Sequence, residues 1–88
     1  MADLTGKAAL ITGAQQGIGA AIAVAFAQAG ADVAINYLDG TKEAEAVAEA
    51  VRATGQRATL IKGDVSAAGM PARMVADAVA AFGRIDIL

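Results

Sequence analysis

The chain has 88 residues, 57% of them hydrophobic and 18% charged, which indicates one small globular domain and excludes a disordered segment. The formal net charge of −2 and the lack of a basic cluster argue against a nucleic-acid partner. The absence of cysteine and histidine excludes a disulfide framework and removes the commonest metal ligand, so no metal site is predicted. The longest apolar stretch, residues 20–27, is too short to cross a bilayer, so we expect a soluble, cytoplasmic protein.

The first predicted elements are a strand and a helix joined by a glycine-rich turn. Residues 7–11 are short and apolar, which is typical of a buried parallel strand. Residues 12–19, Thr-Gly-Ala-Gln-Gln-Gly-Ile-Gly, form the turn, and a helix is predicted to run to residue 29. Gly30 fits a left-handed position after that helix. The larger apolar residues of the helix fall on one face: Ile18, Ile22, Ala25, Phe26 and Ala29.

The glycine-rich turn is the first candidate for a function. The first N–H groups of a helix lack internal partners, and the helix dipole adds partial positive charge there, so a phosphate can bind. The spacing Gly-x-x-x-Gly-x-Gly matches neither the common dinucleotide fingerprint nor the phosphate loop of nucleotide hydrolases. An ordinary turn without a ligand is the alternative. The flanking strand and helix favour a pyrophosphate site.

Two further strands and a helix follow. Residues 32–37 predict a strand, and residues 38–41 a turn in which Asp39 or Thr41 could cap the next helix. That helix is predicted over residues 42–54. Its apolar stripe consists of Ala44, Val47, Ala48 and Val51, and its charged residues form a solvated face. A third strand is predicted over residues 57–61.

The last part of the sequence predicts a loop, a helix and a strand. Residues 62–66 form the loop, and Pro71 marks the start of a helix that ends before Gly83. The predicted buried face of this helix consists of Met74, Val75, Ala78, Val79 and Phe82. Residues 85–88 begin a fourth strand.

This alternation predicts an α/β fold, a Rossmann-like parallel sheet in βαβαβαβ order that stops after the start of the fourth strand. Ligands of such sheets bind beyond the carboxyl ends of the strands. That edge carries residues 13–19, residues 37–39, and the pair Asp64 and Val65. Three loops from separate strands are therefore expected to converge on one crevice.

These residues resemble the N-terminal part of the short-chain dehydrogenase/reductase family. Residues 12–19 match its Thr-Gly-x-x-x-Gly-x-Gly motif, Asp64-Val65 match its adenine-ring pair, and residues 82–88 match the approach to its fourth strand. The resemblance implies that residues 15–19 hold the pyrophosphate and the neighbouring ribose. It also implies that Asp64 accepts a hydrogen bond from the adenine amino group. Without the resemblance, we would interpret Asp64 as a helix cap or a solvated loop residue. The cofactor-binding residues so predicted are Gly13, Gln15, Gln16, Gly17, Ile18, Gly19, Tyr37, Asp64 and Val65.

The cofactor is NAD or NADP by this resemblance, and the residues at its 2′ end depart from both family patterns. Tyr37 stands where NAD-preferring members usually carry aspartate. Leu38 and Gln16 stand where NADP-preferring members usually carry a basic residue. Asp39 would repel a 2′-phosphate if it points inward, whereas Lys42 could attract one. Together these residues slightly favour NAD.

The resemblance implies an NAD(P)-dependent oxidoreductase that transfers hydride between nicotinamide and a small carbonyl or alcohol substrate. The family's catalytic serine and Tyr-x-x-x-Lys are absent from these 88 residues; Tyr37, the single tyrosine, has Thr41 in place of the lysine. We therefore predict no catalytic residue here. We expect residues 1–88 to be the N-terminal part of one NAD(P)-binding Rossmann domain in a truncated sequence, with a homo-oligomer as the complete protein.

The alternative is a short, non-catalytic module that binds a nucleotide or pairs with another chain. A phosphate-loop protein is disfavoured because the Gly-Lys-Ser/Thr of that loop is missing.

Overall fold

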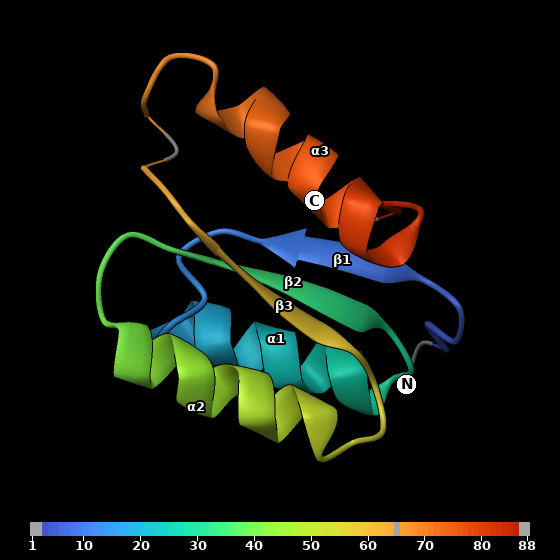
Figure 1. Ribbon diagram of the computed structural model, residues 1–88. Coiled ribbons are helices and arrows are strands. Elements are labelled where there is room, and N and C mark those ends of the chain that lie inside the picture. Colours follow the sequence, from blue (N-terminus) through green and yellow to red (C-terminus); the bar gives the residue numbers. More distant parts are fainter. Residues whose placement is uncertain (1–2, 65, 87–88) are drawn as a thin grey trace.

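The computed structural model describes residues 3–64 and 66–86, which form a parallel sheet between two layers of helices (Figure 1). Strands and helices alternate along the chain, as the sequence predicts. The elements are β1 (Ala8–Ile11), α1 (Gly17–Gln28), β2 (Asp32–Tyr37), α2 (Thr41–Arg52), β3 (Ala58–Lys62) and α3 (Met70–Phe82). Their bounds agree with the predicted ones within two residues, and those of β2 are identical.

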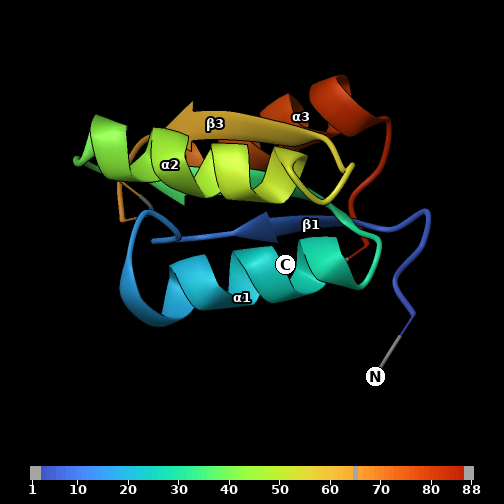
Figure 2. The same cartoon turned by 90° about the horizontal axis from the view of Figure 1, so that it is seen from below.

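The strands are parallel in the order β1-β2-β3, so β2 is central. Ala8 pairs with Asp32 at the start of β1, and Tyr37 pairs with Lys62 at the end of β2. Helices α1 and α2 cover one face of the sheet, and α3 covers the other (Figures 1 and 2). This arrangement confirms the predicted Rossmann-like α/β fold. It brings the carboxyl ends of all three strands to one edge.

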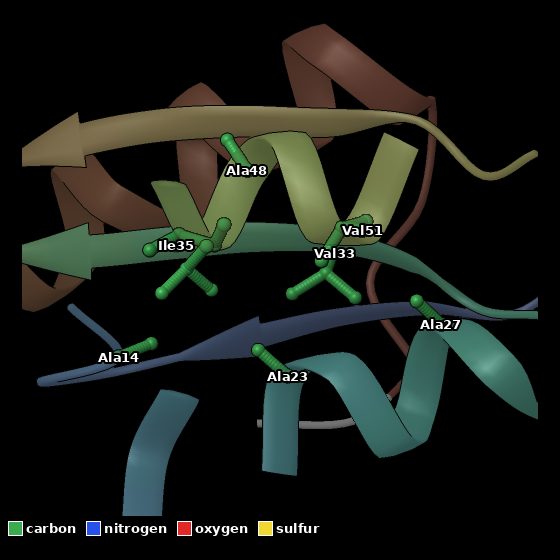
Figure 3. Close-up of a cluster of buried hydrophobic side chains, with 8 residues drawn as sticks. Ala14, Ala23, Ala27, Val33, Ile35, Ala48 and Val51 are labelled. Atoms are coloured by element: carbon green, nitrogen blue, oxygen red, sulfur yellow. The ribbon is translucent and has the colours of Figure 1, made fainter. Parts of the chain in front are cut away.

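The side chains of β2 alternate between two cores, as expected for a strand buried on both faces. Val33 and Ile35 face α1 and α2, where small residues from both helices pack against them (Figure 3). That core consists of Ala14, Ala23, Ala27, Val33, Ile35, Val47, Ala48 and Val51. Ala34 belongs to the core beneath α3, with Leu10, Ile61, Met74 and Ala78. The predicted apolar stripe of α2 is thus confirmed.

Two predicted helix faces need correction. In α1 the buried residues are Ala23 and Ala27, whereas Ile18 is 81% exposed and Ile22 is 40% exposed. The helix lies close to the sheet because alanine side chains are short, so the bulkier face turns away from it. In α3, Met74 and Ala78 are buried as predicted, but Val79 is 40% exposed.

The start of α2 also differs from the prediction. Its N-cap residue is Gly40, with φ of +75°, and no side chain bonds to the cap. Neither Asp39 nor Thr41 therefore caps the helix. Thr41 is already the first helical residue and Asp39 lies before the cap, so each is one position away from the geometry that capping needs.

The predicted fourth strand is not observed in the part that can be described. Ile85 and Asp86 are not in a strand, and Ile87 and Leu88 lie outside the described residues. Asp86 does lie beside β1, because its backbone N–H donates to Ala8 O at 2.8 Å. Its carboxylate accepts from Ala8 N–H at 3.0 Å and so occupies a donor that a strand carbonyl would otherwise bind. Within residues 3–64 and 66–86, no helix has the length and apolar character to cross a membrane.

Candidate functional site

Three glycines shape the turn between β1 and α1, each for a physical reason. Gly13 has φ of +61° and Gly17 has φ of +62°, in the left-handed region that side chains with a Cβ rarely adopt. Gly19 lies so close to the turn that a Cβ built on it would be 2.5 Å from Gly13 O. A side chain at Gly19 would therefore force the turn itself to move.

The N-terminus of α1 opens onto this turn. Gln16 is the N-cap residue, in extended conformation, and its side chain makes no capping hydrogen bond. The first turn of the helix holds no acidic residue. The first N–H groups of α1 are thus left without a side-chain acceptor from the cap, and the helix dipole adds positive potential there. An anion is the ligand that this end can bind.

A first pocket of about 250 Å³ lies where the three strands end. It is lined by Thr12, Gly13, Gln15, Asn36, Leu38, Gly63 and Asp64. Its walls therefore come from the segments that follow β1, β2 and β3. The convergence of three loops expected from the topology is present in the structure.

A second pocket of about 480 Å³ adjoins the first at Thr12, which lines both. It lies between β1 and the exposed face of α1. It is lined by Leu10, Ile11, Thr12, Ile18, Gly19, Ile22 and Phe26. The first pocket alone is smaller than the usual small-molecule sites, whose volumes begin at about 300 Å³. An elongated ligand with a polar and an apolar end could occupy both.

Asp64 is held by a local turn at the rim of the first pocket. Its Oδ1 accepts from the hydroxyl of Ser66 at 2.7 Å and from the backbone N–H of Ser66 at 2.8 Å. These two hydrogen bonds lower the pKa of Asp64 below its ordinary value, and the bond from the hydroxyl has the larger effect. The carboxylate is therefore ionised at neutral pH. A fixed carboxylate at this position can accept hydrogen bonds from a ligand amine.

Asn36 is a residue of this site that the sequence reasoning missed. It lies in β2, is 3% exposed, and also lines the first pocket. Its Nδ2 donates to Ile61 O and Gly63 O, and its Oδ1 accepts from Gly13 N–H. A single polar residue within the apolar strand Val-Ala-Ile-Asn-Tyr is the signal that could have found it, because a buried amide requires partners.

The predicted binding residues are distributed over the turn and both pockets. Gly13, Gln15 and Asp64 line the first pocket, and Ile18 and Gly19 line the second. Gln16 is the N-cap residue of α1, and Gly17 is the first residue of that helix. Tyr37 is buried and does not line the first pocket, whereas its neighbours Asn36 and Leu38 do. Val65 lies outside the described residues.

Gln15 and the turn after β2 form one end of the first pocket. The Oε1 atom of Gln15 is buried and has no hydrogen-bond partner among the described residues. A Cβ built on Gly40 would lie 3.6 Å from Cγ of Gln15 and 2.9 Å from Oε2 of Glu43. The aliphatic part of the Gln15 side chain and the carboxylate of Glu43 thus both approach this turn. No group of three or more possible metal ligands was found within residues 3–64 and 66–86.

Comparison with known proteins gives a consistent result. The family model for short chain dehydrogenase matches residues 7–88. An uncharacterized oxidoreductase of Methylorubrum extorquens is 48% identical over 88 residues, which are all of this chain and 36% of that protein. An L-rhamnose 1-dehydrogenase (NAD(P)(+)) of a Sphingomonas species is 46% identical over 85 residues, 97% of this chain and 34% of that protein.

A solved structure gives the same result. The crystal structure of a short chain dehydrogenase from Burkholderia cenocepacia, in complex with NADP, is 42% identical and superposes with a TM-score of 0.91. The match covers 96% of this chain and 35% of that one. This chain thus spans about a third of the length of the relatives that it matches.

Proposed function

The chain belongs to the short-chain dehydrogenase family, and from that premise we propose that residues 1–88 are the N-terminal part of a single NAD(P)-binding domain in an oxidoreductase. The observation that carries the proposal is the meeting of a glycine turn, a helix N-terminus and the ionised Asp64 around one pocket. The turn and the helix N-terminus suit the pyrophosphate of a dinucleotide, and Asp64 suits its adenine.

The residues present fit such a cofactor. The turn at Gly13 and Gly17 has the open backbone that a pyrophosphate needs, and the N–H groups at the start of α1 would hold it. The carboxylate of Asp64 would accept from the adenine amino group. The buried Oε1 of Gln15 has no partner among residues 3–64 and 66–86, as expected for an acceptor that a ribose hydroxyl would satisfy. Gln16, Ile18 and Gly19 would contact the segment between the two ribose groups.

The bound cofactor would supply hydride chemistry at its nicotinamide ring, with a small carbonyl or alcohol compound as the substrate. Residues 1–88 would bind and orient the cofactor, and they would contribute no group to the proton transfer. The relative from Sphingomonas acts on L-rhamnose, which is a substrate of this chemical class. A cytoplasmic homo-oligomer is the form we propose for the complete enzyme.

We infer a preference for NAD over NADP from charges near the turn after β2. Asp39 lies in this turn, two residues beyond Tyr37, which stands where NAD-preferring members usually carry aspartate. The carboxylate of Glu43 approaches the same turn at Gly40. Both would repel a 2′-phosphate, and Lys42 is the single basic residue in this turn and the first turn of α2.

Isothermal titration calorimetry of the 88-residue chain with NAD⁺ and NADP⁺ tests this function. We expect binding of both, with the lower dissociation constant for NAD⁺. Asp64→Ala should weaken both affinities by about tenfold, the effect of one charged hydrogen bond. Asp77→Ala is the matched control, because it removes an exposed carboxylate of α3 outside both pockets. Absence of binding by the unchanged, folded chain would contradict the proposed function.

A further inference from the structure

Asn36 joins the two loops that flank β2. Its Nδ2 donates to Ile61 O at 3.2 Å and to Gly63 O at 3.0 Å, and these carbonyls lie at the end of β3 and just after it. On the other side, Gly13 N–H in the glycine turn donates to its Oδ1 at 3.3 Å. One side chain from the central strand thus spans the ends of both neighbouring strands.

The hydrogen-bonding capacity of this side chain is almost fully used. An amide carries two N–H donors and an oxygen that accepts, and here both donors and the oxygen have protein partners. Among the residues that the structure describes, Asn36 is the only polar or charged residue that is buried. Because a buried amide is favourable only when bonded, the three partners are fixed relative to one another.

The sheet does not need this side chain to hold its strands together. Backbone bonds already connect the same segments: Ala14 N–H donates to Asn36 O at 3.0 Å, and Gly63 N–H donates to Tyr37 O at 2.9 Å. An apolar residue at position 36 would continue the alternating apolar pattern of β2 and bury more hydrophobic surface. The amide therefore adds a restraint specifically between Gly13 and Gly63, at the ligand-binding edge.

We propose that Asn36 is a positioning residue that fixes the separation between the glycine turn and the loop that carries Asp64. A ligand that contacts both loops, with an adenine at Asp64 and a pyrophosphate at the turn, depends on that separation. A ligand that contacts only one loop does not. This inference rests on the proposed dinucleotide function. Asn36 would affect the bound ligand indirectly, through the positions of the two loops.

The test compares two ligands on the 88-residue chain and its variants, with chemical shifts followed by NMR. In the proposed site ADP contacts Asp64 through its adenine and the glycine turn through its pyrophosphate, whereas adenosine lacks the phosphates that bind the N–H groups of that turn. Asn36→Ala should weaken ADP binding about tenfold, the effect of a lost buried hydrogen bond, and change adenosine binding less than about threefold. Asn36→Leu keeps the branching and the number of heavy atoms of the side chain without its hydrogen-bonding groups, and it serves as a second variant if the alanine variant unfolds.

Val51→Ala is the control for a purely structural effect. It truncates a fully buried side chain near the end of α2 and lies outside both pockets. It should lower the stability of the fold and leave the ratio of ADP to adenosine affinity unchanged. Equal weakening of ADP and adenosine by both Asn36 variants, or no weakening at all, would overturn the positioning role.

Amide hydrogen exchange provides a readout without any ligand. In Asn36→Leu the Gly13 N–H loses its acceptor and should exchange at least about tenfold faster. The Val33 N–H, which donates to Arg57 O at the opposite edge of the sheet, should be unaffected. Unchanged protection of Gly13 would overturn the inference by itself. If the unchanged chain binds neither ADP nor NAD⁺, the proposed function fails, and with it the role of Asn36 in binding.

Discussion

At the scale of single residues, the site depends on side chains whose orientation is fixed by short local hydrogen bonds. Asp64 is the clearest case. Both the hydroxyl and the backbone N–H of Ser66 donate to one of its oxygens, and the pKa of Asp64 is lowered for that reason. A carboxylate held in this way keeps its charge and its direction in the pH range where a cofactor would bind.

Ser66→Ala should therefore raise the pKa of Asp64 towards its ordinary value, because the larger of the two causes is removed. The lowered pKa favours the folded state at pH values above the ordinary carboxyl pKa. This contribution disappears as the pH falls through the pKa of the folded protein, and the variant should lose it at a higher pH. A carbon-detected NMR titration of the carboxyl group measures the shift.

Asp3 is the internal control in the same titration. Thr5 donates to its Oδ1 through hydroxyl and backbone N–H, and these bonds lower the pKa of Asp3 in the same way. It should keep its lowered pKa in Ser66→Ala. An Asp64 pKa that does not change in the variant would contradict the cause assigned here.

The limits of sequence reasoning at this scale follow from the alternation of β2. The motif spacing located the glycine turn and Asp64, since both follow directly from strand ends. Tyr37 was predicted from a family position, and its role stays a prediction. Its side chain is buried and does not line the first pocket, whereas Asn36 and Leu38 do. Because β2 is buried on both faces from Val33 to Tyr37, hydrophobicity does not mark the side of the strand that faces the pocket, and the polar Asn36 is its one local signal.

At the scale of elements, the packing of α1 determines how the glycine turn meets the sheet. The helix packs through Ala23 and Ala27, which are 0% and 2% exposed, against Val33 and Ile35 (Figure 3). Small residues allow the helix axis to lie close to the strands. The same closeness brings Gly19 against Gly13 O at the start of the helix.

Ala23→Leu should destabilise the fold by about 1–3 kcal/mol, the usual cost of overpacking a filled core. Ala25→Leu is the matched control, because Ala25 lies on the same helix, is exposed, and should tolerate the change within about 0.5 kcal/mol. Urea unfolding followed by circular dichroism measures both. Equal stability of the two variants would contradict the observed orientation of α1.

The sequence predicted the order and type of all six described elements, because apolar periodicity and glycine positions are local signals. It predicted the packed face of α2 correctly, since valines alternate there with charged residues. For α1 the size of Ile18 and Ile22 suggested the wrong face. The helix contains almost only apolar residues, so periodicity separates its two sides weakly, and the close fit of alanines to the sheet decides the orientation.

At the scale of the whole molecule, the chain is compact but leaves one apolar region uncovered. The radius of gyration is 11.7 Å, close to the value of about 12 Å expected for a folded chain of this length. The second pocket nevertheless lies open beside β1, with Ile18 and Ile22 exposed at its rim. The open region is therefore part of a compact fold.

The isolated 88-residue chain should self-associate through this region, because contiguous apolar surface of this kind is uncommon on soluble monomers. Sedimentation velocity should show species larger than the monomer whose fraction rises with protein concentration. Ile22→Gln should shift the distribution towards monomer. Val79→Gln should not, although Val79 is equally exposed at 40%, because it lies on α3 across the sheet. A monomer at all concentrations, or an equal effect of both substitutions, would show that the region beside β1 does not drive association.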